Sequence, residues 1–447
     1  MLCAILAWTT FAFGGVYPGG LAVSALACAA LALAYRADIG RRGPHPELDR
    51  LLILVLLAGM LQLVPIPRAI LAWLSPAAER VWRSLTLVDA GAPLPLSIDL
   101  EKSAAAALLY GLAIALFFTA REIFSRGGIR LAARAVALIG FALAGVAIAQ
   151  DATGDGRMYW KWWPVDEGPR PFGPFVNRNH FGTWAVLAVP LCIGYLWTHA
   201  VAHHGPGPDA TWQRRLKAAL DGRAAMLLAA STLLILATVV SLSRSSMAAL
   251  LSAAIAGAVL TRGRAPHAME RSSRPVLLLI GAMALAGIAV ASSVDRETLT
   301  IRLSATGVAA ADRLTIWRDT LAVIRDFWLT GTGLGTYQTS MAIYQRSSPG
   351  VLFNQAHNHY LQVVSEGGLL VAVPVLLAVA AFARTALRSL REDRSGMFWV
   401  RAGAASGLFG VAVQSLFETG LRTPANTVLA VLLAAIATHP PAHGRQH

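Results

Sequence analysis

Residues 355–383 read QAHNHYLQVVSEGG followed directly by LLVAVPVLLAVAAFA. The second part is an uncharged apolar run of the kind that enters a bilayer, where about 20 residues cross about 30 Å of hydrocarbon. The first part carries two histidines, an asparagine, two glutamines and Glu366. Buried polar groups are unfavourable unless they are paired. This junction therefore predicts a membrane helix whose polar end serves a function.

The whole chain shares this apolar character. Of its 447 residues, 56% are hydrophobic and 14% are charged, whereas a soluble globular chain has about 25% charged residues. The composition predicts an all-α polytopic membrane protein with about twelve transmembrane helices in a single membrane domain, residues 1–447. The predicted segments are residues 2–14, 19–35, 51–66, 104–120, 131–150, 179–198, 224–242, 245–261, 275–293, 357–383, 397–417 and 424–438.

The arginines between these segments predict the orientation. Every second connection is short and basic, for example residues 121–130 and 384–394. Basic connections stay in the cytoplasm, so we expect a multi-pass protein of the bacterial inner membrane with both termini cytoplasmic. The net charge of +14 arises from these connections, and no nucleic-acid partner is predicted. The three cysteines lie in apolar runs and are interpreted as inert thiols.

The remaining connections predict loops on the outer face, at residues 67–103, 151–178 and 294–356. The last is a large extracytoplasmic loop between the ninth and tenth helices. Within it, apolar residues recur at helical spacing, which predicts an amphipathic helix on the outer membrane boundary. Asp319 is expected on the surface of this helix and Asp312 at its N-cap. The apolar residues are Leu314, Trp317, Leu321, Ile324 and Trp328.

Four polar clusters fall on this outer face under the predicted topology. They are PFGPFVNRNHFGTW (171–184), SLSRSSMAALL (241–251), IRLSATGVAAADRLTIW (301–317) and AHNHYLQ (356–362). Polar clusters that are distant in sequence but share one face predict a site between helices.

Individual residues in these clusters allow more than one interpretation. Arg244 is either a snorkelling arginine or a bidentate clamp for phosphate oxygens. His357 is a candidate general base, because histidine titrates near neutral pH. We expect His359 to face water at the helix end, and Glu366 to be satisfied by a neighbouring helix or by an arginine. No metal site is predicted, since no carboxylate lies at metal-ligand spacing from the histidines.

Two further motifs have a structural interpretation. TGTGLGTY (330–337) resembles a dinucleotide loop, but it follows a predicted amphipathic helix rather than a strand, so we interpret it as a tight turn near the membrane surface. WKWWP (160–164) is interpreted as a set of interfacial anchors, with contact to sugar rings as the less favoured alternative.

The four clusters together resemble the O-antigen ligase/O-antigen polymerase superfamily. The resemblance rests on FGPFVNRNHFG, LSRSSMAALL, DRLTIWRDTLAVIRDFWLTGTGLGTY and AHNHYLQVVSEGGLL, and it defines a ligase-like core at residues 170–383. The chain departs from the family at Gln355, where many members have histidine, and at Arg178, where proline is frequent.

The resemblance implies a C-type glycosyltransferase that needs neither metal nor cofactor. Its donor would be a glycan on undecaprenyl diphosphate, and its acceptor a glycan, lipid A-core or a protein. His357 would accept the proton of the acceptor hydroxyl, and Arg244 would stabilise the leaving diphosphate. The implied substrate-binding residues are Arg178, Asn177, Asn179, Arg302, Arg313 and Asn358.

The resemblance leaves ligase and polymerase open, because the two differ only in the acceptor. A transporter of a small anion and a non-catalytic component of polysaccharide export are alternatives of another class. Transporters usually place broken helices near the membrane midplane. Here the polar residues gather on one face, which favours an enzyme with an active site facing the periplasm.

Overall fold

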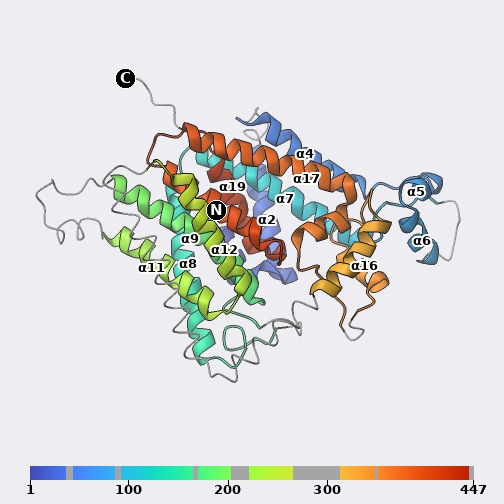
Figure 1. The fold of residues 1–447 in the computed structure, drawn as a ribbon, viewed down its shortest axis with the longest axis horizontal. Helices are drawn as coiled ribbons and strands as arrows, with labels where there is room; N and C mark the ends of the chain where they lie inside the picture. The colour runs from blue at the N-terminus through green and yellow to red at the C-terminus, as the bar shows by residue number, and fades with distance from the viewer. Residues whose placement is uncertain are drawn as a thin grey trace, which may run out of the picture.

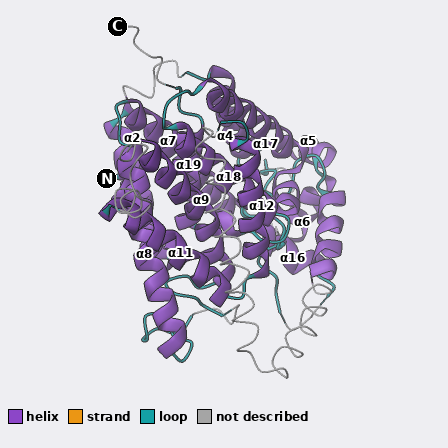
Figure 2. Cartoon of the chain, turned by 60° about the vertical axis from the view of Figure 1, so that its left-hand side comes forward, coloured by secondary structure: helices purple, strands orange, loops and turns teal. Residues whose placement is uncertain are grey.

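The computed structural model of the chain describes residues 1–36, 44–85, 92–164, 170–202, 221–264, 313–347 and 351–441. These residues form helices joined by loops (Figure 2), and their only extended pairs are isolated bridges such as Ile66 with Leu94. The predicted all-α fold is confirmed for this part of the chain. The elements are α1 (Leu2–Phe11), η1 (Phe13–Gly15), α2 (Pro18–Ala34), α4 (Pro46–Leu61), α5 (Arg68–Leu74), α6 (Pro76–Leu85), α7 (Leu100–Ser125), α8 (Ile129–Thr153), α9 (Arg178–Ala202), α11 (Gly222–Val240), α12 (Arg244–Thr261), a helix at 313–326, α16 (Tyr337–Tyr344), α17 (His359–Glu392), α18 (Phe398–Gln414), η2 (Gly420–Arg422) and α19 (Pro424–Ala437).

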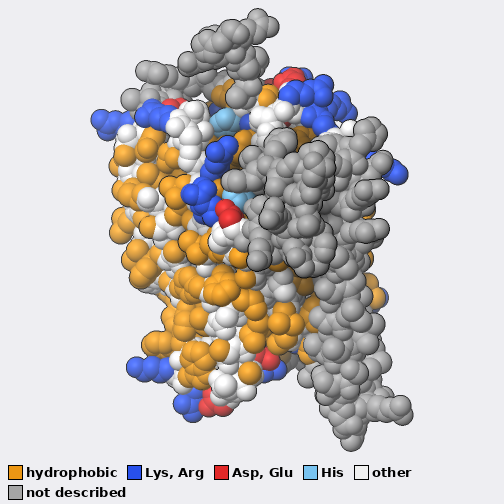
Figure 3. All heavy atoms as spheres, turned by 90° about the vertical axis from the view of Figure 1, so that its left-hand side faces the viewer, with side chains coloured by type: hydrophobic (Ala, Val, Ile, Leu, Met, Phe, Trp, Pro, Cys, Tyr) orange, Lys and Arg blue, Asp and Glu red, His pale blue; other side chains and the backbone are white. Residues whose placement is uncertain are grey.

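Several helices have the length and composition of membrane spans. Among the described residues there are six of them: α7, α8, α9, α11, α12 and α17. Figure 3 shows apolar side chains in a broad belt, with charged side chains mostly toward its two ends. The multi-pass character is therefore confirmed, and the number of twelve spans stays a prediction. The predicted segment 275–293 lies outside the described residues.

Helix α9 forms the centre of the bundle. It packs against α8, α11, α12, α18 and α19, and its Trp184, Leu187 and Leu191 are fully buried. Helices α9 and α18 approach closely at Gly403, which has no side chain. A Cβ atom at this position would lie only 2.2 Å from the carbonyl oxygen of Pro190. Helices in lipid associate largely through such close packing at small residues.

Long-range contacts define two ends of the bundle. At the end where α7, α9, α12 and α17 finish, Arg264 donates to the carbonyl oxygen of Arg391, and Arg121 pairs with Asp49. We call this the basic end. We call the opposite end, where α9, α12, α17 and α19 begin, the site end.

Helix α17 is broken near the site end. Gly368 has φ 55° and ψ −163°, so the helical hydrogen-bond pattern is interrupted there. The glycine-rich turn at 329–335 supplies the missing partners: Gly333 N donates to the carbonyl oxygen of Glu366 (2.9 Å), and Leu370 N donates to that of Leu329 (2.9 Å). A Cβ atom at Gly331 would lie 2.2 Å from the Glu366 oxygen. The motif TGTGLG is therefore a turn that packs against a helix break.

A second hydrophobic core lies outside the bundle. It contains Leu71, Ala78, Val323, Phe327 and Tyr337, contributed by α5, α6, the helix at 313–326 and α16. We call residues 66–85, 92–98 and 313–347 the cap. In Figure 1, α5, α6 and α16 lie together at the right of the molecule.

The amphipathic helix predicted in the large loop forms at 313–326. Leu314, Leu321 and Trp328 are exposed, as membrane-facing side chains would be, and the location of this helix at the membrane boundary stays a prediction. The expectation for Asp319 was wrong. Its side chain is buried and accepts hydrogen bonds from the amide and hydroxyl of Ser347, because the helix buries its other face in the cap. Asp312 lies outside the described residues.

Candidate functional site

His357 lies at the site end, just before α17. Its φ of 48° is in the left-handed region, which residues other than glycine seldom adopt. Neighbouring contacts fix the segment: the indole of Trp317 donates to the carbonyl oxygen of Ala356 (3.0 Å), and His359 N donates to that of Ser415 (2.8 Å). Such backbone strain, about 1–3 kcal/mol, is typical of functional sites.

A buried carboxylate faces this histidine. Glu418 follows α18 and is 1% exposed, and its Oε2 lies 3.7 Å from Nδ1 of His357. Both atoms are buried and lack a hydrogen-bond partner among the described residues. The separation exceeds that of a hydrogen bond, but catalytic hydrogen bonds often tighten only when substrate binds. The structure therefore places the carboxylate beside the histidine without a hydrogen bond between them.

The other oxygen of Glu418 joins distant parts of the chain. Oε1 accepts hydrogen bonds from Asn179 Nδ2 and Arg313 Nη2, both at 2.7 Å. The amide oxygen of Asn179 accepts in turn from the hydroxyl of Ser243 (2.8 Å), in the joint between α11 and α12. Glu418 therefore brings together the starts of α9 and α17, the joint before α12 and the start of the helix at 313–326.

The other predicted site residues that the structure describes lie at or next to the first turns of helices. Asn177 accepts from the amide of Asn179, and Asn358 caps α17 by accepting from the amide of Leu361, so both stabilise helix starts. Arg178 and Arg244 are the first residues of α9 and α12. Arg178 is partly exposed and Arg244 is exposed. Arg302 lies outside the described residues.

A second buried carboxylate lies deeper, at the break of α17. Glu366 accepts from Arg422 Nη1 (2.7 Å), Gln362 Nε2 (3.0 Å) and the amide of Gly335 (2.9 Å). Burial lowers the pKa of Arg422, but the neighbouring Glu366 carboxylate outweighs that effect and the pKa lies above its usual value. The guanidinium therefore stays charged. An arginine does satisfy Glu366, as expected, although the sequence did not identify which one.

Two further histidines lie at this end. The expectation that His359 faces water was wrong, because its Nδ1 is buried without a partner among the described residues. His180 was not predicted as a site residue. Its Nδ1 lies 2.8 Å from the hydroxyl of Thr423, and its Nε2 is buried.

The residues that sequence reasoning missed share one signal. Glu418 and Arg422 are ionisable residues within five positions of the end of the apolar run 397–417. Ionisable residues at membrane helices are usually functional. Glu366 lies inside a predicted segment, whereas these two residues lie in the short connection between the predicted segments 397–417 and 424–438, so only a search extended to segment ends would have found them.

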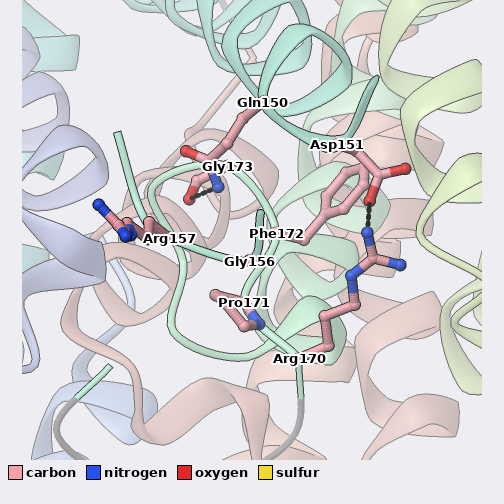
Figure 4. A pocket seen from close by; sticks show the side chains of 8 residues that line it. All are labelled: Gln150, Asp151, Gly156, Arg157, Arg170, Pro171, Phe172 and Gly173. Atoms are coloured by element: carbon pink, nitrogen blue, oxygen red, sulfur yellow. Dashed lines mark hydrogen bonds and ion pairs between the residues drawn. The ribbon is translucent and has the colours of Figure 1, made fainter. Parts of the chain in front are cut away.

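A shallow pocket lies on the outer loop, apart from His357. Its lining includes Gln150 and Asp151 at the end of α8, and Arg157, Arg170 and Phe172 from the loop (Figure 4). Arg170 pairs with Asp151 at 2.7 Å. In the described part of the chain, no group of three or more His, Cys, Asp or Glu side chains could hold a metal ion.

A comparison with protein families finds one match in this chain. A family model described as O-antigen ligase matches residues 229–376, about a third of the chain. Over these residues the chain is similar to the O-antigen ligase family. The match lies within the ligase-like core expected at 170–383, and it includes Arg244, Arg313, His357 and Glu366. The O-antigen ligase match ends before Glu418, so that residue enters the site on structural grounds alone. No curated protein matches the chain.

Proposed function

We propose that this chain is a glycosyltransferase of the bacterial inner membrane. It moves a glycan from undecaprenyl diphosphate onto an acceptor hydroxyl at the outer face, as an O-antigen ligase or an O-antigen or exopolysaccharide polymerase. The acceptor is a glycan, lipid A-core or a protein. The observation that supports this most strongly is the position of His357, with its Nδ1 facing the buried carboxylate of Glu418, in a chain with an O-antigen ligase match.

His357 acts as the general base. Its Nδ1 faces Glu418 and keeps its proton there, which leaves Nε2 to accept the proton of the acceptor hydroxyl. The hydroxyl oxygen then forms a bond to the anomeric carbon. The bond from that carbon to the diphosphate oxygen breaks, and its electron pair leaves with the diphosphate. The carboxylate stabilises the imidazolium that results.

Arginines supply positive charge for the leaving diphosphate, so that no metal is needed. Arg244 and Arg178 begin helices at the site end, and planar guanidinium groups match phosphate oxygens. Arg313 binds Glu418, so we assign it to holding that carboxylate. Arg302 remains our candidate for the second phosphate or the acceptor.

The proposed orientation places the basic end in the cytoplasm. Arg121, Arg264 and Arg391 lie there, in agreement with the preference of basic segments for the cytoplasmic side. The site end then faces the periplasm, where lipid-linked glycans are elongated and transferred.

The test is the pool of undecaprenyl-diphosphate-linked glycan in cells that express the wild type or His357→Ala at equal levels. We expect the variant to accumulate single repeat units if the chain is a polymerase, and long lipid-linked chains if it is a ligase. The control is His45→Gln, since His45 binds Thr438 at the basic end. An unchanged pool in His357→Ala would contradict the proposed function.

A further inference from the structure

A cavity opens between α4 and α17 at the basic end, far along the chain from the motifs of the site. Its volume is about 290 Å³, and its lining consists of Glu47, Arg50 and Leu51 from the start of α4 and of Leu377 and Arg384 from α17. The two helices pack against each other (Figure 1). Because α17 finishes at this end, Leu377 lies about two turns deeper in the bundle than Arg384. The cavity therefore has charged groups at its outer edge and leucine side chains toward the membrane.

The two arginines of the lining are available to a ligand. Arg50 is exposed, and no ion pair involves it in the part of the chain that the structure describes. Arg384 donates with Nη2 to Oε1 of Glu47 (2.5 Å), but these two side chains are 63% and 69% exposed. An ion pair in contact with water contributes little to stability, so an anion can share Arg384 with Glu47.

Neighbouring residues add to the positive charge around the cavity. Arg388, one turn beyond Arg384 on α17, is exposed, and its charge acts on the ring of His45 just before α4. Asp49 is the other carboxylate in the first turn of α4, and it pairs with Arg121 of α7. The described groups around the cavity therefore carry a net positive charge.

Exposed apolar residues continue from the cavity toward the centre of the membrane. Leu54 lies one turn beyond Leu51 on α4 and is 45% exposed, and Val373 lies one turn before Leu377 on α17 and is 46% exposed. Residues three or four positions apart share one face of a helix. A cationic edge that continues into an apolar surface suits a ligand with both an anionic group and a hydrocarbon chain.

We propose that this cavity binds an anionic glycerophospholipid. The guanidinium groups of Arg50 and Arg384 bind its phosphate oxygens, and its acyl chains lie along Leu54 and Val373. Basic pockets between transmembrane helices on the cytoplasmic side bind anionic headgroups in this way. A zwitterionic lipid fits less well, because its ammonium group would face the arginines. Binding is independent of the proposed function, and only the leaflet, the cytoplasmic one, rests on the proposed orientation.

A lipid in this cavity joins α4 to α17 at the end away from His357. At the other end of α4, Gln62 donates to the carbonyl oxygens of Thr330 (2.7 Å) and Glu366 (2.9 Å), beside the break of α17. The lipid would thus hold at the basic end the same two helices that Gln62 connects near the site end. Bound lipid is therefore expected to stabilise the folded protein.

The binding test uses the purified full-length protein in detergent, with phosphatidylglycerol and phosphatidylethanolamine of equal acyl chains as probes. Native mass spectrometry is expected to show that the wild type binds phosphatidylglycerol at least about fivefold more tightly, as one favourable arginine contact provides. Arg50→Gln/Arg384→Gln is expected to lose this preference. The matched control is Arg130→Gln/Arg262→Gln, which removes two exposed charges at the basic end outside the cavity. Equal binding of the two lipids by the wild type, or the same preference in both double variants, would overturn the proposal.

Thermal unfolding distinguishes a lipid from a free anion. Phosphatidylglycerol is expected to raise the Tm of the wild type by at least about 2 °C, because a ligand that binds only the folded state stabilises it. Inorganic phosphate is expected to leave the Tm unchanged, since it gains nothing from the apolar part of the cavity. Arg50→Gln/Arg384→Gln should unfold at the wild-type Tm without lipid and show no shift with it. An equal shift with inorganic phosphate, or an equal shift in this variant, would refute a lipid site between α4 and α17.

Discussion

Glu418 illustrates how one residue organises a site in a membrane protein. A carboxylate that is 1% exposed is unfavourable unless charged and polar partners surround it. Arg313 and Asn179 satisfy one of its oxygens, so that the second oxygen is available to His357. In the proposed mechanism its role is to position the histidine and to balance the charge that the histidine gains.

The variant Glu418→Gln tests this role. The amide keeps the size of the side chain but removes the charge, so kcat is expected to fall at least about 10²-fold, with a small change in KM. Glu418→Asp should restore part of the activity. The matched control is Glu79→Gln, because Glu79 is also a buried carboxylate, paired with Arg68 and Arg83 in the cap. Equal activity of Glu418→Gln and wild type would exclude the positioning role.

The polar cluster before α17 indicated His357, and the family resemblance implied Asn179 and Arg313. It did not identify Glu418, whose partners Arg313 and Asn179 are 105 and 239 residues away in sequence. Local pattern carries no information on such a pairing. Only the packing of α9, α17 and α18 brings these residues together.

Helix α17 also combines a feature that local sequence pattern predicts with one that depends on a distant segment. Its apolar run predicts a helix, and a helix forms. The break at Gly368 depends on hydrogen bonds to residues 328–333 of another segment, so the run alone cannot predict it. Glycine is needed at Gly331 for a geometric reason: its φ is 69°, and a side chain would meet the backbone of Glu366.

Gly331→Ala is therefore expected to destabilise the fold. Overpacking alone lowers the free energy of unfolding by about 1–3 kcal/mol, and a non-glycine residue in the left-handed conformation lowers it by about 1–2 kcal/mol more. The control is Gly145→Ala, since no atom lies within 4 Å of a Cβ atom at that position of α8, and alanine favours a helix by about 0.5–1 kcal/mol. Thermal unfolding of the purified proteins in detergent measures both. A Tm of Gly331→Ala at or above wild type would contradict the role of the turn.

For the whole molecule, the structure separates two ends that the arginine pattern had already distinguished. The contacts of Arg264 with Arg391 and of Glu418 with Arg313 lie at opposite ends of the bundle. The sequence predicts this alternation because apolar segments of similar length must cross the membrane in turn. It could not predict the cap, because its core joins segments more than 200 residues apart.

Cysteine labelling tests the orientation. Cys28 and Cys192 are buried, so a Cys3→Ser protein is expected to show little labelling of its native cysteines. An impermeant maleimide added to spheroplasts is expected to label Trp73→Cys, and to label Arg394→Cys only after lysis. The reverse result would place the site end in the cytoplasm and refute the proposed use of a periplasmic donor.

The pairing of Glu366 with Arg422 has a consequence for biosynthesis. The chain is made from its N-terminus, and the two residues are 56 positions apart, so at about 5–20 residues per second the arginine follows the glutamate by about 3–11 s. The glycine turn and Gln362 are made before Glu366. The neutral hydrogen-bond partners of the Glu366 carboxyl group are therefore synthesised before its charged partner. During synthesis, Glu366 in α17 therefore gains its cationic partner only after the segment that follows α18 has been made.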